Sequence, residues 1–172
     1  SSFLISRSSN IYKALSSVLG FFERRKPHFV EGGIKTDLEN HVVLIGSHQV
    51  GENLVRFFEK EKIPFLVLDF NPYQVEKLAK EEIPVIFGDM GDPEVLQLLN
   101  LEKARMVIST VPDIYDNKLL IEDLKTMHPA VPVIVRSDSV REAKNLYKFG
   151  ASFVYIPDVV SGEYLVDMLR TH

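Results

Sequence analysis

Short apolar runs alternate with amphipathic stretches from residue 41 onward. The runs are continuous and rich in β-branched residues, which is typical of strands buried on both faces of a parallel sheet. The six runs are 41–46, 65–69, 85–88, 106–110, 133–136 and 153–156. The stretches between them have helical spacing and cover 51–61, 73–80, 93–99, 115–127 and 140–149. This alternation predicts an α/β fold, a Rossmann-like doubly wound parallel six-stranded sheet.

Residues 1–40 have a different pattern. Apolar residues recur at spacings of three and four between Ile11 and Phe22, which predicts an N-terminal amphipathic helix. Pro27 and the Gly32-Gly33 pair end it, and a linker is expected at about 27–40. The chain therefore divides into 1–40, a helix and linker, and 41–172, the α/β domain. The helix either packs on its own domain or lies next to a membrane or partner.

Charge is unevenly distributed between these two parts. The chain has 20 Lys and Arg against 24 Asp and Glu, and the first 27 residues hold five basic residues but one acidic residue. A leader of +4 thus precedes a remainder of -8, and the acidic domain argues against nucleic acid as a partner. The chain has no Cys, which excludes thiolate chemistry, and no run reaches the roughly 20 apolar residues of a membrane span. A soluble chain in a cytoplasmic setting is expected.

The turn after the first predicted strand is the first candidate site. Gly46-Ser47-His48-Gln49-Val50-Gly51 keeps the outer glycines of G-x-G-x-x-G but has His48 at the middle one. The outer glycines permit a tight turn and close packing of helix on strand, whereas a side chain in the middle crowds a diphosphate. One phosphate could still lie at the helix N-terminus, with His48 as a donor. The alternative is a turn without ligand.

Acidic and polar residues end the next strands. Asp69, 23 positions after Gly46, matches the carboxylate that binds ribose hydroxyls in NAD-type sites, and no Arg follows it in Asp69-Phe70. We therefore expect NAD(H) or an adenine mononucleotide, with NADP unlikely. Asp89 and Met90 would lie near an adenine ring, and Thr110 would flank the phosphate and ribose. Helix caps and turns are the structural alternatives for these residues.

The sequence offers little for catalysis or for a metal. It has no elbow-like Ser/His/Asp set, no closely spaced His pair and no Tyr-x-x-x-Lys dyad after the fourth strand. Asp113, Asp116 and Asn117 could hold a cation, although a loop cap is the more economical interpretation. We expect neither an enzyme nor a metal site.

The residues from Val42 to Ile156 resemble the RCK or TrkA-N (KTN) domains that regulate potassium channels and transporters. The resemblance rests on the first-strand run ending in Gly46, on Asp69-Phe-Asn-Pro, on Gly88-Asp-Met-Gly-Asp-Pro, on Asp116-Asn117-Lys-Leu-Leu and on Val-Arg136-Ser. The leader is similar to the segment that follows the last transmembrane helix of Kef-like monovalent cation:proton antiporters.

The resemblance implies a regulatory domain on the cytoplasmic face of the inner membrane. It would bind AMP, ADP, ATP or NAD(H), form a homodimer through a late helix at about 159–169, and control potassium or sodium:proton antiport through a transmembrane domain of the same polypeptide. Tyr164, Leu165, Met168 and Leu169 would form the apolar face of that helix. The alternatives are an RCK subunit of a potassium channel or uptake system and a small NAD-dependent oxidoreductase.

Overall fold

The computed structural model describes residues 38–128 and 130–171, and these contain one six-stranded sheet. The strands are β1 His41–Ile45, β2 Phe65–Asp69, β3 Val85–Phe87, β4 Ala104–Ser109, β5 Val133–Arg136 and β6 Phe153–Tyr155. Each neighbouring pair is parallel, in the order β3-β2-β1-β4-β5-β6. The predicted doubly wound parallel sheet is therefore confirmed.

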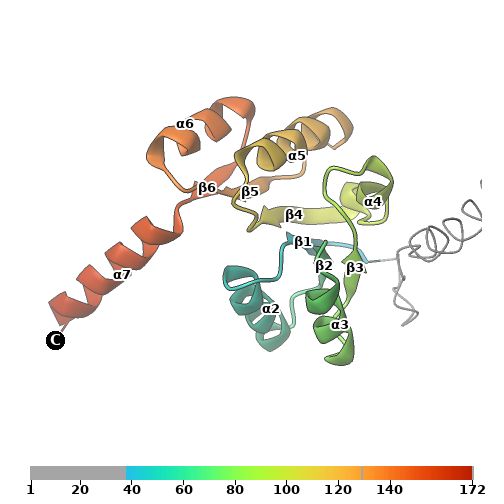
Figure 1. Ribbon diagram of the computed structural model, residues 1–172, viewed down its shortest axis with the longest axis horizontal. Coiled ribbons are helices and arrows are strands. Elements are labelled where there is room, and N and C mark those ends of the chain that lie inside the picture. Colours follow the sequence, from blue (N-terminus) through green and yellow to red (C-terminus); the bar gives the residue numbers. More distant parts are fainter. Residues whose placement is uncertain (1–37, 129, 172) are drawn as a thin grey trace, which may run out of the picture.

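Helices cover both faces of this sheet (Figure 1). The helices are α2 Val50–Glu61, α3 Pro72–Lys80, α4 Pro93–Gln97, α5 Ile114–Met127, α6 Val140–Phe149 and α7 Pro157–Thr171, with a 3₁₀ turn, η1, at Leu101–Lys103. Val55 and Phe58 of α2 pack with Val75 and Leu78 of α3 on one face. The helices α4, α5 and α6 bury Leu96, Leu120 and Leu146, among others, on the opposite face. The strands lie between two apolar layers, which explains their continuous apolar runs.

Side-chain caps set the start of several helices. Asn71 and Asp92 accept hydrogen bonds from the backbone N–H of Tyr73 and Glu94, and a proline follows each cap. The helix predicted over 93–99 ends earlier, at Gln97. The left-handed backbone of Asn100 (φ 48°) turns the chain there, while Leu99 and Leu101 stay buried and so extend the apolar spacing beyond the helix.

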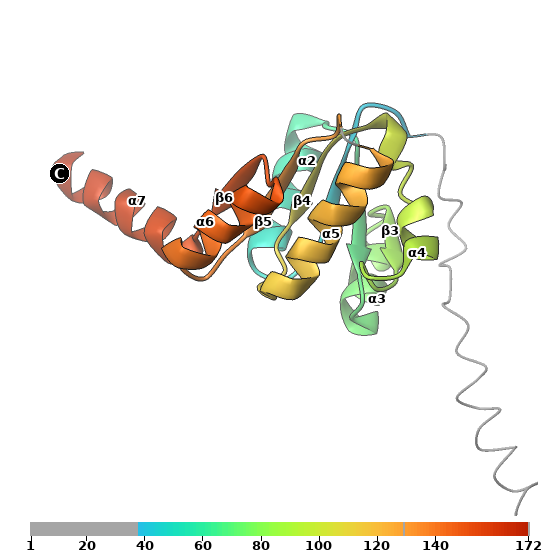
Figure 2. The same cartoon turned by 90° about the horizontal axis from the view of Figure 1, so that it is seen from above.

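The helix α7 differs from the others because it projects from the body of the domain (Figures 1 and 2). It includes the predicted helix over 159–169, yet none of its residues is buried. The predicted N-terminal amphipathic helix lies outside the described residues.

Candidate functional site

The strand order reverses between β1 and β4, and two adjoining cavities lie at the carboxyl ends of the strands there. The larger has a volume of about 320 Å³ and the smaller about 170 Å³. Gly46, Asp69, Phe70 and Val111 line both cavities. The larger is lined further by His48, Gln49, Val50, Asn71, Gln74, Thr110, Pro112 and Arg136, and the smaller by Ile45, Leu68, Gly88, Asp89, Met90 and Asp116. This is the place where open parallel sheets bind ligands.

The two outer glycines of the β1–α2 turn have the conformational roles that the sequence predicts. Gly46 has φ +84°, and a Cβ there would lie 2.6 Å from Thr110 Oγ1. A Cβ on Gly51 would lie 2.2 Å from the carbonyl oxygen of Gly46, so only glycine permits this approach of α2 to β1. Thr110 Oγ1 donates a hydrogen bond to the Gly46 carbonyl (3.0 Å). The close contacts at Gly46 and Gly51, together with the Thr110 hydrogen bond, therefore fix the conformation of this turn.

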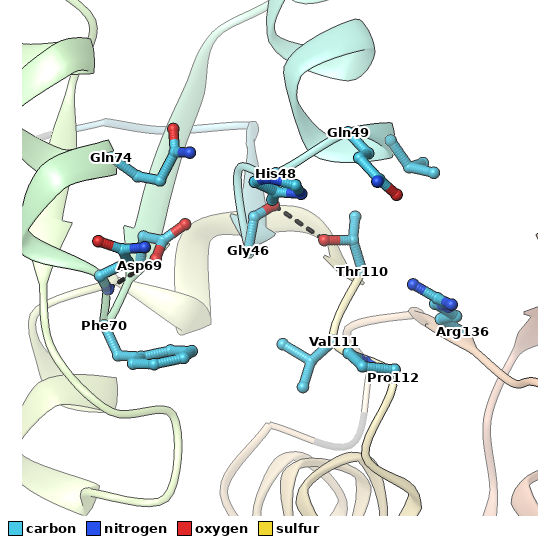
Figure 3. A pocket seen from close by; sticks show the side chains of 12 residues that line it. Gly46, His48, Gln49, Asp69, Phe70, Gln74, Thr110, Val111, Pro112 and Arg136 are labelled. Carbon is cyan, nitrogen blue, oxygen red and sulfur yellow. Dashed lines mark hydrogen bonds between the residues drawn. The ribbon is translucent and has the colours of Figure 1, made fainter.

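The middle of this turn faces the larger cavity. His48 and Gln49 are exposed and lie at its rim, near Thr110 (Figure 3). Gln49 adopts φ +45° and precedes Val50, the first residue of α2. No side chain caps the N-terminus of α2, whereas side chains cap α3, α4, α5 and α6. Unpaired N–H groups and the positive end of the helix dipole at such a terminus favour an anion.

Asp69 holds the loop after β1 to the loop after β2. It is only 6% exposed, and its Oδ2 accepts hydrogen bonds from the Ser47 N–H (2.8 Å) and hydroxyl (2.6 Å). Its Oδ1 accepts a third from the Asn71 N–H (2.8 Å). Ser47 itself lines neither cavity, so it supports the site through Asp69. A ribose contact to Asp69 stays a prediction, and the carboxylate has a structural role in any case.

Arg136 is the residue that the site prediction left out. It ends β5 and is the one Lys or Arg among the residues that line the two cavities. Its Nε and Nη2 donate hydrogen bonds to Asp138 Oδ1 at 3.1 and 2.9 Å. Figure 3 shows its side chain across the cavity from Asp69, beside Thr110 and Pro112. Its position at the carboxyl end of a predicted strand is the sequence signal that could have identified it as a site residue.

The smaller cavity has acidic walls. Asp69, Asp89 and Asp116 line it, and no basic residue does. Burial, with the neighbouring carboxylates of Asp113 and Asp89, raises the pKa of Asp116. Met90 lines this cavity but is 6% exposed and belongs to the core, whereas Phe70 is 71% exposed and lines both cavities. Phe70 is therefore the more accessible surface for stacking.

Two members of the group Asp113, Asp116 and Asn117 have structural functions. Asp113 caps α5 by accepting hydrogen bonds from the N–H groups of Tyr115 and Asp116, as the loop-cap interpretation predicts. Asn117 is fully buried and bonds to backbone carbonyls. Within the part of the chain that the structure describes, no cluster of three His, Cys, Asp or Glu residues could hold a metal ion.

The family comparison agrees with this geometry. The TrkA-N domain family model matches residues 42–157, from β1 to the first residue of α7. The chain belongs to the TrkA-N domain family. This TrkA-N domain is 31% identical over 135 residues to a putative K(+) efflux antiporter KefB from Alkalimonas amylolytica, covering 78% of the chain and 20% of that relative. The chain thus spans about a fifth of the length of that antiporter.

Solved structures resemble the TrkA-N domain in the same region. The crystal structure of the TrkA-N domain of the inner membrane protein ybaL from Escherichia coli has a TM-score of 0.73 at 24% identity and covers 77% of this chain and 98% of that one, which shows the fold. GsuK bound to ADP has a TM-score of 0.68 at 25% identity, covering 76% and 34%. The GsuK channel bound to NAD has a TM-score of 0.64 at 25% identity, covering 70% and 22%.

Among the described residues, no helix combines the length and the apolar character that crossing a bilayer requires.

Proposed function

We propose that this chain is a regulatory domain that binds an adenine nucleotide and controls a potassium or sodium:proton antiporter. The observation that carries the proposal is the pair of adjoining cavities at the switch point of the sheet, the larger with Arg136 in its wall and the smaller with three carboxylates. Both structures of GsuK named above contain ligands that include an adenosine phosphate. The KefB relative is named as an antiporter, which favours a transporter over a free-standing enzyme.

The charges orient the ligand. The N-terminus of α2, which has no side-chain cap, and the Arg136 guanidinium would contact the phosphate. The acidic walls of the smaller cavity repel a phosphate but accept hydrogen bonds from an amino-bearing base. The ribose then lies over Asp69 and Phe70, which line both cavities. His48 occupies the position where a glycine would admit a diphosphate, so a mononucleotide such as AMP is preferred to NAD(H) and NADP(H).

Binding would regulate transport without chemistry. A ligand shifts the equilibrium between two domain arrangements only by the difference in its affinity for them. In this proposal the domain lies at the cytoplasmic face of the membrane and acts on a transmembrane antiporter domain of the same polypeptide. The likeness to GsuK favours one further candidate, a regulatory subunit of a potassium channel.

Calorimetric titration of the 172-residue chain with adenosine, AMP, ADP, NAD+ and NADP+ tests the nucleotide proposal. We expect AMP to bind more tightly than adenosine because Arg136 and α2 contact the phosphate. Arg136→Ala should weaken AMP about tenfold, the effect of one charge-assisted hydrogen bond, and leave adenosine unchanged. Arg141→Ala is the matched control, because Arg141 is exposed on α6 and lines neither cavity.

The failure of all five compounds to bind the unsubstituted chain would contradict a nucleotide site. Turnover of NADH with a substrate would instead support the oxidoreductase alternative.

The projecting helix α7 supports a homodimer as the second part of the proposal. Seven large apolar side chains on it are between 44% and 81% exposed, and they are Val159, Val160, Tyr164, Leu165, Val166, Met168 and Leu169. An isolated helix of 15 residues is marginal in water, and this many exposed large apolar side chains on one helix mark an interaction site. A second copy of the chain, which presents the same helix, satisfies this need with a two-fold symmetric interface.

Sedimentation velocity tests the dimer. The unsubstituted chain should sediment as a dimer, whereas Leu165→Lys combined with Leu169→Lys should give monomers because the interface would then bury two charges. Glu163→Lys, on the side of the same helix opposite Leu165 and Leu169, is the control for an altered charge. A monomeric unsubstituted chain would contradict the homodimer and assign α7 to another partner.

A further inference from the structure

One buried amide joins the two turns that flank the larger cavity. Asn117 lies in the first turns of α5 and is fully buried. Its Nδ2 donates hydrogen bonds to the carbonyl oxygens of Val111 (2.8 Å) and Arg136 (3.2 Å). Val111 follows β4 and Arg136 ends β5, and both line the larger cavity.

The Asn117 amide lies beyond the point where the pairing of β4 with β5 ends. The last paired residues of β4 and β5 are Ser109 and Val135. The residue that follows β4, Thr110, donates its N–H to Ile45 on β1, away from β5. Asn117 therefore supplies a connection between the ends of β4 and β5 beyond their last ladder pair.

Arg136 is thus held at both of its ends. Asn117 fixes its backbone carbonyl, and Asp138 accepts hydrogen bonds from its guanidinium. Its partner on the other side is Tyr155 of β6, in register with it. A long side chain with a fixed base and a fixed tip loses little further entropy when it contacts a ligand.

Packing alone does not account for an amide at this position. The neighbouring inward residues of α5 are Leu120, Ile121 and Leu124, which are apolar. Asn117 Oδ1 is buried and, among the described residues, has no hydrogen-bond partner. A buried polar atom without a partner costs free energy, and a leucine of similar size would avoid this cost. The two bonds that Nδ2 makes are therefore the reason for the asparagine.

We propose that Asn117 is a positioning residue for phosphate recognition. It holds the end of β5 against the β4–α5 turn, and so sets where the Arg136 guanidinium meets the phosphate of the ligand. The inference rests on the nucleotide-binding function proposed above. It predicts that Asn117 affects only the part of the affinity that depends on the phosphate and on Arg136.

A double-mutant cycle of Asn117→Leu and Arg136→Ala tests this, with AMP and adenosine as ligands in calorimetry. Asn117→Leu should weaken AMP about fivefold and leave adenosine within about twofold. In the Arg136→Ala background, Asn117→Leu should weaken AMP no further. Asn100→Gly is the control, because Asn100 also donates from Nδ2 to a backbone carbonyl, that of Leu38, and lines neither cavity. Glycine suits its positive φ.

Circular dichroism on heating verifies that each variant folds. If Asn117→Leu does not fold, Asn117→Ser replaces it, because the serine side chain is too short to bridge both carbonyls. Equal weakening of AMP and adenosine, an unchanged AMP affinity, or a full effect in the Arg136→Ala background would each overturn the inference. Failure of the unsubstituted chain to bind either ligand would instead overturn the proposed function, and this inference with it.

Discussion

The two cavities share four residues yet differ in the charged groups that line the rest of their walls. The larger has the uncapped α2 terminus, His48 and Arg136, and the smaller has Asp89 and Asp116. Because Asp69 and Phe70 line both, the difference gives one elongated site a direction. An anionic group belongs at one end and a hydrogen-bond donor at the other.

The glycines beside the two cavities also differ. The turn beside the larger cavity leaves no room for a Cβ at Gly51. At Gly91, beside the smaller cavity, a Cβ would meet Asp89 Oδ1 at 3.4 Å and Leu119 Cδ2 at 3.6 Å, which are ordinary contacts. At Gly88, which lines the smaller cavity, a Cβ would lie 2.7 Å from Val95 Cγ1, so both ends are closely packed and only the contact at Gly51 is with the backbone.

The largest expected effect on stability comes from comparing alanine substitutions at Gly51 and Gly91. Gly51→Ala should lower the free energy of unfolding by about 3 kcal/mol, because the new Cβ would lie 2.2 Å from a backbone oxygen that cannot move aside. Gly91→Ala should change it by no more than about 0.5 kcal/mol. Urea unfolding measures both values. Similar values for the two variants would show that the backbone contact at Gly51 does not constrain the turn.

The second effect concerns the carboxylate that both cavities share. Asp69→Asn should lower the free energy of unfolding by about 2 kcal/mol, because one of its two acceptor oxygens becomes a donor group while three donors remain. Asp158→Asn, at an exposed position of α7, should have no effect. Urea unfolding decides, and an unchanged stability would mean that Asp69 does not hold the two loops together. Any loss of nucleotide affinity in this variant must be read against the loss of stability.

Much of this site could be predicted from the sequence because it follows from strand ends. Gly46, Asp69, Asp89 and Thr110 each end or follow an apolar run, and the parallel topology brings such ends to one edge. The direct contacts among these residues could not be predicted. Ser47 was expected to contact the ligand, but its hydroxyl is bonded to Asp69, a pairing between residues 22 positions apart that periodicity does not encode.

Arg136 and Asn117 are residues whose roles could not be predicted from the sequence. Both were visible as part of the family resemblance, but their roles depend on β4 lying beside β5 and on where their ladder ends. A residue whose partners are two backbone carbonyls from different turns carries no local sequence signal. The position of α7 could not be predicted either. Its apolar residues predict a helix, but they do not predict that this helix projects from the body of the domain (Figure 2).

The third effect tests whether the rim of the larger cavity selects against dinucleotides. His48→Gly should raise the affinity for NAD+ about fivefold and leave AMP almost unchanged, because the side chain obstructs a diphosphate but not a single phosphate. His48→Ala is the companion variant and should give a smaller gain. Calorimetry with both ligands measures the ratio. A loss of AMP affinity in both variants would mean that the imidazole binds the phosphate.

The smallest effect concerns the acidic end. The raised pKa of Asp116 means that its charged form is disfavoured in the folded domain, by burial and by Asp113 and Asp89. Its ionisation therefore destabilises the fold at neutral pH and has no effect at a pH below its ordinary pKa, where the carboxyl is protonated in both states. Asp116→Asn should raise the free energy of unfolding by up to about 0.5 kcal/mol at pH 7, a small value because solvent screens this exposed residue, and by almost nothing at pH 3. Urea unfolding at the two pH values measures the difference. An equal gain in the free energy of unfolding at pH 7 and at pH 3 would exclude charge repulsion as the cause. The smaller cavity would then have no electrostatic preference that distinguishes it from the phosphate end of the site.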